Sequence, residues 1–253
     1  MRENDMQSEL VIGRNPVMEA LKSGRDIDTL YISKGERQGS VGKIVSMCRD
    51  QNIIIKEVDA KKLDFMCGNA NHQGVIARVA AHSYSSVEDI FERAASKGEN
   101  PFIIICDEIE DPHNLGAIIR TAECAGAHGV IIPKRRSATL NFTVAKTSAG
   151  ALEYMPVARV SNLAKTIDEL KARGVWIYGT DMAGDVWCKT DLKGSLAIVV
   201  GSEGKGMGRL VREKCDFVLS LPMRGEISSL NASVASGIIM YEVNRQRLDI
   251  KSI

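Results

Sequence analysis

The stretch Leu196–Leu210, LAIVVGSEGKGMGRL, decides the fold class, because it joins an apolar strand to a glycine-rich loop. Five consecutive apolar residues end at Val200, and four glycines follow with Glu203 and Lys205 between them. A strand that is apolar throughout is typical of a parallel sheet whose two faces are both covered by helices. Ligands of such sheets bind beyond the carboxyl ends of the strands. The glycine loop is therefore a candidate binding element.

The region 100–253 repeats this order of strand and helix. Apolar runs at 102–109, 129–133 and 196–201 each precede a segment with helical periodicity. Alternation of this kind predicts an α/β domain with a parallel sheet. The loops that follow its strands are where we expect functional residues.

Residues 8–82 predict a second, smaller α/β unit. Asn15 is expected to cap its first helix, with Pro16 at the first helical position. The predicted apolar face of this helix consists of Val17, Ala20 and Leu21. The segment 83–99 is polar and serine-bearing at its start and holds one short amphipathic helix, so we expect it to link the small unit to the α/β domain at 100–253.

The composition is that of a packed globular protein. Of 253 residues, 44% are hydrophobic and 26% are charged, which excludes a disordered chain. The first ten residues lack the apolar core of a signal peptide, and the apolar runs are too short to cross a bilayer. We therefore expect a soluble, cytoplasmic protein.

Cysteine, histidine and charge patterns narrow the chemistry further. The six cysteines include no C-x-x-C, and the four histidines form no metal-binding pair. Buried, reduced cysteines and no metal site are the expectation. The net charge is only +1, so any binding of RNA must rest on local basic patches.

The first unusual post-strand segment runs from 107 to 129. Asn114 is placed to cap a helix, with Arg120 at the edge of its apolar stripe. That stripe consists of Leu115, Ile118, Ile119 and Ala122. Taken alone, these residues also fit a plain helix in which Arg120 pairs with Glu123 on the surface.

The glycine loop matches neither common nucleotide-binding pattern. Its spacing, G-x-x-G-x-G-x-G, differs from the G-x-G-x-x-G motif of nicotinamide-dependent enzymes. That motif also follows the first strand of its domain, whereas this loop comes late in the chain. Lys205 is followed by Gly206 rather than Ser or Thr, which excludes a phosphate-binding P-loop. The remaining possibilities are backbone contacts to an adenine or ribose, a close passage of two chain segments, or an ordinary glycine turn.

The third segment, 218–247, joins a strand to a long final helix. Ser228 or Ser229 is the expected cap. The predicted apolar stripe consists of Leu230, Val234, Ile238 and Tyr241, and the other face is rich in alanine, serine and glycine. Small residues allow close helix approach, either within one chain or in a dimer.

Together, the three segments resemble the SpoU (TrmH) family of SPOUT methyltransferases. The matching residues are Asn114, Gly116 and Arg120 in the first motif, Gly201, Glu203 and Gly204 in the second, and Pro222, Ser229, Leu230 and Asn231 in the third. GRNPVMEAL (13–21) and HQGVIARV (72–79) resemble the family's L30e-like RNA-binding domain. The stretch 111–138 is similar to the branch that methylates a guanosine in large-subunit ribosomal RNA.

This resemblance implies transfer of a methyl group from S-adenosyl-L-methionine to the ribose 2′-hydroxyl of a guanosine in 23S rRNA. It also implies a homodimer and a deep trefoil knot in the C-terminal domain. A transfer RNA guanosine as substrate, or a non-catalytic RNA-binding module for ribosome assembly, remain the alternatives.

The resemblance also implies a set of site residues. The catalytic set is Asn114, Arg120, Glu203, Ser229 and Asn231, and the cofactor-binding set is Thr180, Gly201, Leu221, Met223 and Leu230. The RNA-binding set is Arg14, Lys134, Arg135, Arg136 and Arg224, for which a solvated basic turn is the alternative at 134–136. Because a guanidinium stays protonated in proteins, we expect Arg120 to stabilise negative charge on the 2′-oxygen rather than to act as a base.

Overall fold

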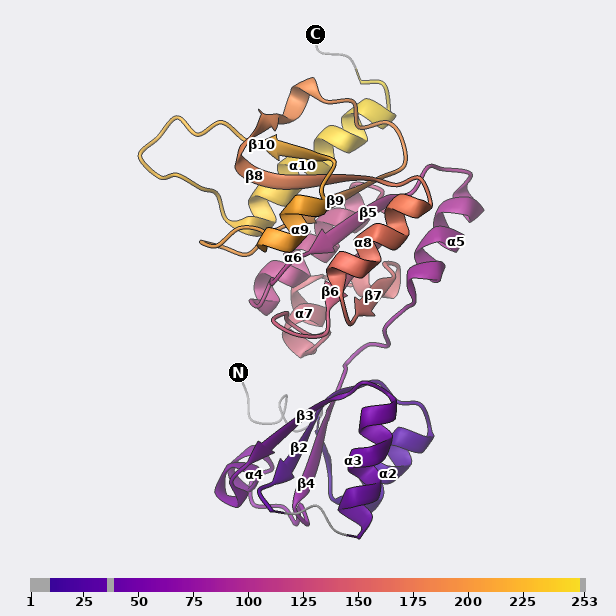
Figure 1. Cartoon of the computed structure of the whole chain (residues 1–253), viewed down its shortest axis with the longest axis vertical. Coiled ribbons are helices and arrows are strands. Elements are labelled where there is room, and N and C mark those ends of the chain that lie inside the picture. Colours follow the sequence, from indigo (N-terminus) through magenta and orange to yellow (C-terminus); the bar gives the residue numbers. More distant parts are fainter. Residues whose placement is uncertain (1–9, 36–38, 251–253) are drawn as a thin grey trace. The chain divides into compact units, whose positions relative to one another are not determined.

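The structure, a computed structural model, describes residues 10–35 and 39–250 (Figure 1). The chain divides into two compact units. One unit comprises Met1–Ser83 with Thr139–Phe142, and the other comprises Tyr84–Ala138 with Thr143–Ile253. Each unit has its own sheet and its own hydrophobic core, and each is described by itself below.

The first unit is built on a four-stranded sheet with the order β1-β4-β2-β3. The strands are β1 Leu10–Ile12, β2 Ile27–Ser33, β3 Ile54–Val58 and β4 Val75–Val79. β2 and β3 are parallel, and β4 runs antiparallel to both β1 and β2. Helices α2 (Arg14–Lys22) and α3 (Ser40–Asp50) pack on one face, and α4 (Ala60–Met66) packs on the other (Figure 1).

Helix α2 buries the face that the sequence predicts, but it begins elsewhere. Val17, Ala20 and Leu21 are all buried. The N-cap is Gly13 and not Asn15, because the carbonyl oxygen of Gly13 accepts the first helical bond, 3.2 Å from the amide nitrogen of Val17. Gly13 has a φ of 95°, a conformation that glycine adopts without strain.

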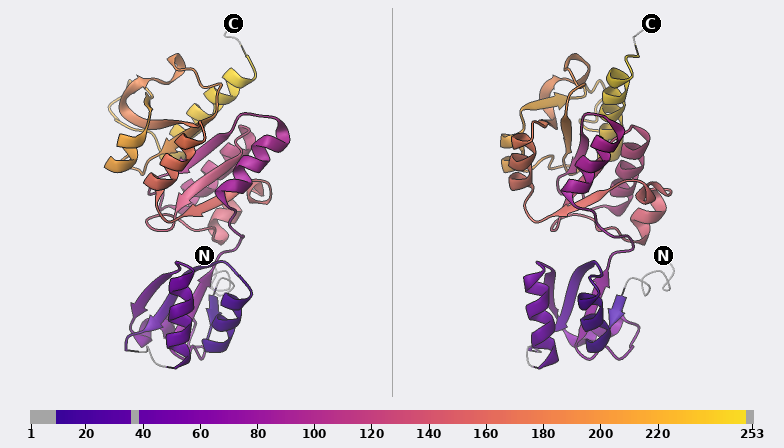
Figure 2. Two further views of the ribbon diagram at one scale, coloured as in Figure 1. Left: turned by 45° about the vertical axis from the view of Figure 1, so that its right-hand side comes forward. Right: turned by 90° about the vertical axis from the view of Figure 1, so that its right-hand side faces the viewer.

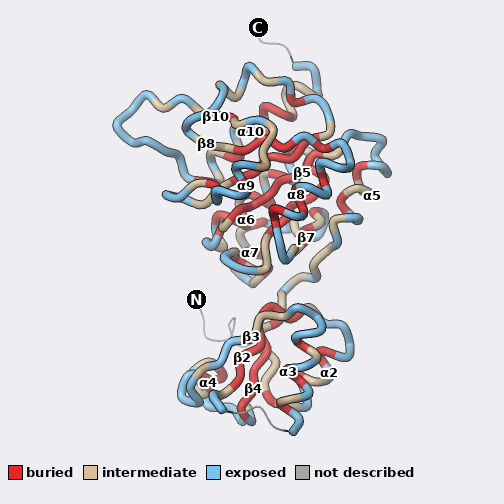
Figure 3. The backbone as a smooth tube through the Cα atoms, in the orientation of Figure 1, coloured by how far each residue is buried: buried red, intermediate tan, exposed pale blue. Residues whose placement is uncertain are grey.

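The second unit has a six-stranded sheet with the order β10-β8-β9-β5-β6-β7, and all of its neighbouring strands are parallel. The strands are β5 Phe102–Cys106, β6 Gly129–Pro133, β7 Val157–Val160, β8 Trp176–Val186, β9 Leu196–Val200 and β10 Phe217–Ser220. β5 and β9 are buried along their whole length, as Figure 3 shows for the middle of the unit. The predicted α/β fold with a parallel sheet is confirmed.

Helices cover both faces of this sheet (Figure 2). α5 (Val87–Lys97), α8 (Leu163–Ala172) and α9 (Arg209–Lys214) share one core with the sheet. On the opposite side, α6 (Pro112–Cys124) and α10 (Ala232–Arg247) pack against each other, and the short α7 (Phe142–Thr147) lies against α6. None of the helices within the described residues has the length and hydropathy to cross a membrane.

The segment 83–99 contains a helix that belongs to the second unit. Ser86 and Asp89 form a reciprocal capping box at the start of α5, and Ile90 is fully buried in the core of the second sheet. Most of the segment is therefore packed helix rather than free chain. The domain boundaries at 82 and 100 stay a prediction.

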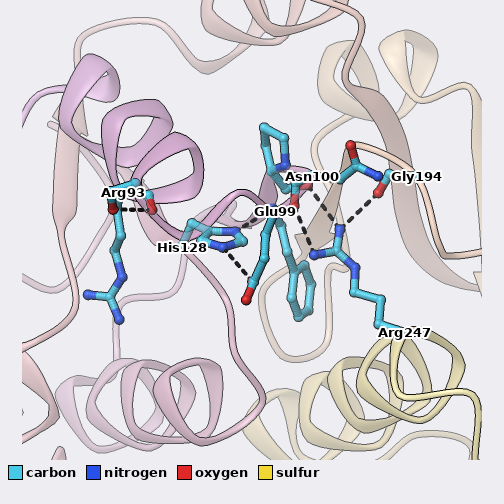
Figure 4. A network of polar contacts seen from close by, with 9 residues as sticks. Arg93, Glu99, Asn100, His128, Gly194 and Arg247 are labelled. Carbon is cyan, nitrogen blue, oxygen red and sulfur yellow. Dashed lines mark hydrogen bonds and ion pairs between the residues drawn. The ribbon is translucent and has the colours of Figure 1, made fainter.

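A polar network ties the start of β5 to the last helix (Figure 4). Arg247 donates to the carbonyl oxygens of Asn100 (2.9 Å), Pro101 (3.2 Å) and Gly194 (2.8 Å). His128, fully buried, accepts from the amide of Phe102 at Nδ1, so its Nε2 must carry the proton that faces Glu99 at 3.0 Å. Burial lowers the pKa of His128, although Glu99 opposes this shift.

The cysteines are free thiols in several environments. Cys48, Cys67 and Cys106 are buried, and burial raises the pKa of both Cys48 and Cys106 to about 12. Cys124 and Cys188 are exposed, so the expectation of buried cysteines is wrong for these two.

Candidate active site

Asn114 lies in the first turn of α6 and does not cap it. The N-cap is Asp111, whose carboxylate accepts from the amide of His113 at 3.1 Å, and Pro112 takes the first helical position. This corrects the predicted cap and leaves the side chain of Asn114 available for other contacts. The predicted stripe of Leu115, Ile118, Ile119 and Ala122 is fully buried.

Asn231, rather than Ser228 or Ser229, caps α10. Its side-chain oxygen accepts from the amides of Ser233 (2.9 Å) and Val234 (3.3 Å). Because the cap uses only the oxygen, the amide nitrogen of Asn231 can donate in another direction.

The glycine loop is a closed turn in which the backbone approaches itself. Ser202 and Gly206 exchange two backbone hydrogen bonds of 3.0 and 2.9 Å. A Cβ atom on Gly201 would lie 2.3 Å from the carbonyl carbon of Gly206, and Gly206 itself has a φ of 68°. The loop ends where the amide of Gly208 donates to Asp107, 2.7 Å away. The close approach of two chain segments therefore explains Gly201, whereas Gly204 and Gly206 have positive φ angles that favour glycine.

The three motifs meet at Glu203. The amide nitrogen of Asn114 donates to Oε1 of Glu203 at 3.1 Å, and that of Asn231 donates to the same oxygen at 2.5 Å. Asn231 also donates to Oδ1 of Asn114 at 2.9 Å. Three of the five predicted catalytic residues thus form one hydrogen-bonded triangle at the carboxyl ends of β5 and β9.

A cavity of about 310 Å³ opens beside this triangle. Its wall includes all five residues of the predicted cofactor-binding set: Thr180, Gly201, Leu221, Met223 and Leu230. Ser229 and Glu203 line it as well, and Ala235 and Ile239 of α10 form part of its apolar wall. The cavity is therefore bounded by part of β8, by the segments after β9 and β10, and by the last helix.

A second cavity, of about 270 Å³, shares part of this wall. Ser202, Glu203 and Lys205 line both cavities, and Asn114 lines the second. The rest of the second cavity comes from the segment between β5 and α6, namely Glu108, Ile109, Glu110 and Asp111. Glu203 therefore separates two adjoining spaces.

Arg120 lines neither of these two cavities. It is exposed on α6, six residues and about 9 Å along the helix axis beyond Asn114. No described residue forms a hydrogen bond or ion pair with it, so the pair with Glu123 is absent.

The predicted RNA-binding residues are dispersed. Arg136 pairs with Glu108 at 2.8 Å, which places it at the edge of the second cavity, and Arg135 beside it is exposed. Lys134 is half-buried, and burial lowers its pKa. Arg224 is exposed between β10 and α10, whereas Arg14 lies in the first unit, where its Nε donates to the carbonyl oxygen of Gln73 at 2.9 Å.

Comparisons with known proteins agree with this geometry. The model of the SpoU rRNA Methylase family matches residues 101–241. This chain belongs to the SpoU methylase family. A second model, described as RNA 2′-O ribose methyltransferase substrate binding, matches residues 10–85. The resemblance inferred from the three motifs is thereby confirmed.

Relatives of this SpoU-family chain match it over nearly its full length. A protein of Bacillus subtilis named as a TrmH family tRNA/rRNA methyltransferase, YacO, is 52% identical over 242 residues, covering 95% of this chain and 97% of the relative. The SpoU methyltransferase AviRb of Streptomyces viridochromogenes, crystallised with AdoMet, superposes with a TM-score of 0.61 at 26% identity, covering 98% and 95% of the two chains. An AdoMet-bound rRNA methyltransferase of Sinorhizobium meliloti gives 0.61 at 25% identity, covering 99% and 95%.

The SpoU-family site contains residues that sequence reasoning missed. Asp181 and Ser202 line the main cavity, and Asp107 anchors the glycine loop. Asp107 directly follows an apolar run, a signal that could have identified it. No group of three or more potential metal ligands is present among the described residues.

The predicted apolar stripe of α10 is largely exposed. Val234, Ile238 and Tyr241 are 51%, 37% and 53% exposed. The buried side instead presents Ala232, Ser236, Ile239, Met240 and Val243. Small residues face α6, and a Cβ on Gly237 would lie 3.5 Å from Thr121 of that helix. Close packing of α10 on α6 therefore leaves the larger apolar side chains outside.

Proposed function

We propose that this SpoU-family protein transfers a methyl group from S-adenosyl-L-methionine to the ribose 2′-hydroxyl of a guanosine in 23S rRNA. The observation that carries the proposal is the triangle of Asn114, Glu203 and Asn231 beside the larger cavity. Family membership supports the class of reaction, and the AdoMet complex of AviRb supports the cofactor.

The larger cavity fits the proposed cofactor in its chemistry. An adenosyl group needs apolar walls and backbone donors and acceptors, which Leu221, Leu230 and the closed glycine turn can offer. When bound, S-adenosylmethionine supplies an electrophilic methyl group on a positively charged sulfur. Thr180, within β8, and Met223, shortly after β10, complete the proposed cofactor-binding set.

Positioning accounts for most of the catalysis in this proposal. Methyl transfer requires the acceptor oxygen in line with the sulfur–carbon bond, so rigid walls lower the barrier. Asn114, Glu203 and Asn231 brace one another, and Ser229 in the same wall can hold the ribose. Arg120 contributes a fixed positive charge that favours the alkoxide form of the 2′-hydroxyl.

A second copy of the chain supplies Arg120 in this proposal. Arg120 has no partner among the described residues and lines neither cavity, yet it lies on α6 beside the exposed apolar stripe of α10. In a two-fold dimer, both copies contribute the same surface to the interface. A dimer through α6 and α10 would therefore bury Val234, Ile238 and Tyr241. It would also bring α6 of the partner to the cavity wall. The homodimer thus completes the active site.

The proposed RNA class, domain organisation and cellular location rest on relatives in the family. A ribosomal substrate is supported by the Sinorhizobium relative named an rRNA methyltransferase and by the match to the SpoU rRNA Methylase family model. The match of residues 10–85 to the substrate-binding model supports RNA of either class. The proposal also includes two domains, at 8–82 and 100–253, with a trefoil knot in the second. It places the protein in the cytoplasm. A transfer RNA guanosine is the second candidate, since YacO is named for both RNA classes.

Methylation of purified RNA tests the proposed function. Ribosomal and transfer RNA from a strain lacking the protein are incubated with the enzyme and labelled S-adenosylmethionine, and alkali-resistant linkages are mapped. We expect one resistant linkage 3′ of a guanosine in 23S rRNA. A resistant linkage only in transfer RNA would favour the second candidate. Failure to bind S-adenosylmethionine at millimolar concentration, measured by calorimetry, would indicate a non-catalytic module.

A further inference from the structure

The outer face of α4 in the first unit carries an exposed aromatic ring between lysines. Phe65 is 84% exposed, more than any other large hydrophobic side chain among the described residues. Lys61 and Lys62 precede it by four and three positions, so the three side chains project from the same face of the helix. We call Lys61, Lys62 and Phe65 the α4 face.

Phe65 has no structural role that would explain an aromatic ring here. Helix α4 packs on the sheet through Leu63, and Cys67 follows on the same buried side, where both contact the cluster with Tyr31 and Ile76. Phe65 points away from that cluster, and Figure 3 shows most of α4 exposed. A single exposed apolar side chain is ordinary by itself, so the charges around Phe65 decide whether this face suits a ligand.

The charges around Phe65 suit a polyanion. Lys61 and Lys62 are exposed and form no ion pair with any described residue. The nearest acidic residues of the same segment have other partners: Asp59 pairs with Lys34 at 2.9 Å, and Asp64 contacts His72 at 3.0 Å. The α4 face therefore presents two lysines without ion-pair partners among the described residues, beside one aromatic ring.

We propose that the α4 face binds single-stranded RNA, with Phe65 stacked on an unpaired base and Lys61 and Lys62 against the flanking phosphates. Aromatic rings stack on any base, and lysines neutralise the backbone, which is how proteins hold unpaired nucleotides. A protein partner would need a wider apolar patch than one ring between two charges. The inference rests on the proposed function, since it assigns a substrate contact to the RNA-modifying protein.

The test uses the full-length protein and an RNA oligonucleotide of about 12 nucleotides with one central 2-aminopurine, whose fluorescence falls when it stacks. The wild type and Phe65→Tyr are expected to quench the probe and to bind it equally well. Phe65→Leu retains the apolar side chain but has no aromatic face. It should bind about tenfold more weakly and quench little. Because Phe65 is exposed, thermal unfolding of these variants should match the wild type.

Salt dependence tests the lysines separately. The double variant Lys61→Ala, Lys62→Ala should lower the slope of log affinity against log salt by about 0.7 for each phosphate that the protein no longer neutralises. Lys43→Ala is the matched control, because Lys43 is also exposed and unpaired among the described residues but lies on α3, across the sheet. Its slope should not change.

Several outcomes would overturn the inference. Quenching by Phe65→Leu equal to that of the wild type would point to an apolar protein contact instead, and an equal effect of Lys43→Ala would mean nonspecific charge attraction. No binding of the probe by the wild type would also reject the inference. If the wild type methylates RNA while Phe65→Leu is unaffected in binding, only this inference fails. If the wild type transfers no methyl group to RNA, the proposed function fails.

Discussion

The side-chain nitrogen of Asn231 lies 2.9 Å from the side-chain oxygen of Asn114, so the cap of the last helix is bonded to the first turn of α6. The two residues are 117 positions apart in the chain. Asn231 uses its oxygen to cap α10 and its nitrogen to hold Asn114 and Glu203. One side chain therefore contributes both to the stability of the fold and to the wall of the cavity.

Substitutions at Asn231 should separate these two roles. Asn231→Ala removes the cap and the hydrogen bond to Glu203, so we expect the free energy of unfolding to fall by about 2 kcal/mol. Asn231→Ser retains a good cap but is too short to reach Glu203, so its free energy of unfolding should fall by about half as much.

Both variants should be at least about tenfold slower in single-turnover methyl transfer. A wild-type rate in Asn231→Ser would contradict a role for this hydrogen bond in positioning. Urea unfolding and rapid-quench assays measure the two effects.

Gly201→Ala should disrupt the glycine turn. The added Cβ would lie 2.3 Å from the backbone of Gly206, which cannot move without opening the turn. We expect a decrease of about 1–3 kcal/mol in unfolding free energy and much weaker binding of S-adenosylmethionine in calorimetry. Gly194→Ala is the control, since nothing lies within 4 Å of its added Cβ. Equal unfolding free energies and equal binding of S-adenosylmethionine in the two variants would show that the turn does not need the close approach at Gly201.

Stability should fall in mild acid because of His128. Burial lowers its pKa in the folded protein, whereas the unfolded chain has the ordinary value near 6.5. The unfolded state therefore binds the extra proton first, so the stabilisation is present above about pH 6.5 and is lost as pH falls through the folded pKa. Because of this group, the free energy of unfolding measured in urea should be about 1 kcal/mol lower at pH 5.5 than at pH 7.5. His128→Gln should remove that difference. An unchanged pH dependence in this variant would assign it to other groups.

Arg120→Lys should remove most of the activity although it keeps the positive charge. A guanidinium can hold the 2′-oxygen and the adjacent phosphate with two parallel donors, and an ammonium cannot reproduce this fork. We expect single-turnover methylation to slow by about tenfold to a hundredfold with unchanged binding of S-adenosylmethionine. Activity equal to that of the wild type would exclude the bidentate role. Arg209→Lys is a suitable control, because Arg209 is exposed, lines neither cavity and belongs to none of the predicted site sets.

The sequence predicts strands better than it predicts helix faces and caps. β9 coincides with the apolar run at 196–200, because burial on both faces leaves a continuous hydrophobic signal. Helix α4 gives no such signal, since only Leu63 of its seven residues is buried. The predicted caps of α6 and α10 are wrong because several Asp, Asn and Ser residues lie near each helix start, and any of them can cap.

The site depends on information that periodicity does not contain. Asn114, Glu203 and Asn231 meet because β9 lies beside β5, and strand order cannot be derived from local pattern. Only the family motifs predict their grouping. The pattern of Val234, Ile238 and Tyr241 predicts an apolar stripe but not its exposure, because periodicity does not show which partner covers a stripe.

Mixing two inactive variants tests most directly whether the active site combines the cavity of one chain with Arg120 of another. Arg120→Ala keeps an intact cavity, and Asn231→Ala keeps an intact Arg120. After the two are unfolded and refolded together, half of the dimers should be mixed, and each mixed dimer should have one complete site. We predict that methyl transfer recovers to about a quarter of the wild-type level, whereas each variant refolded alone stays inactive. A mixture as inactive as its components, with mixed dimers shown to form, would contradict the account.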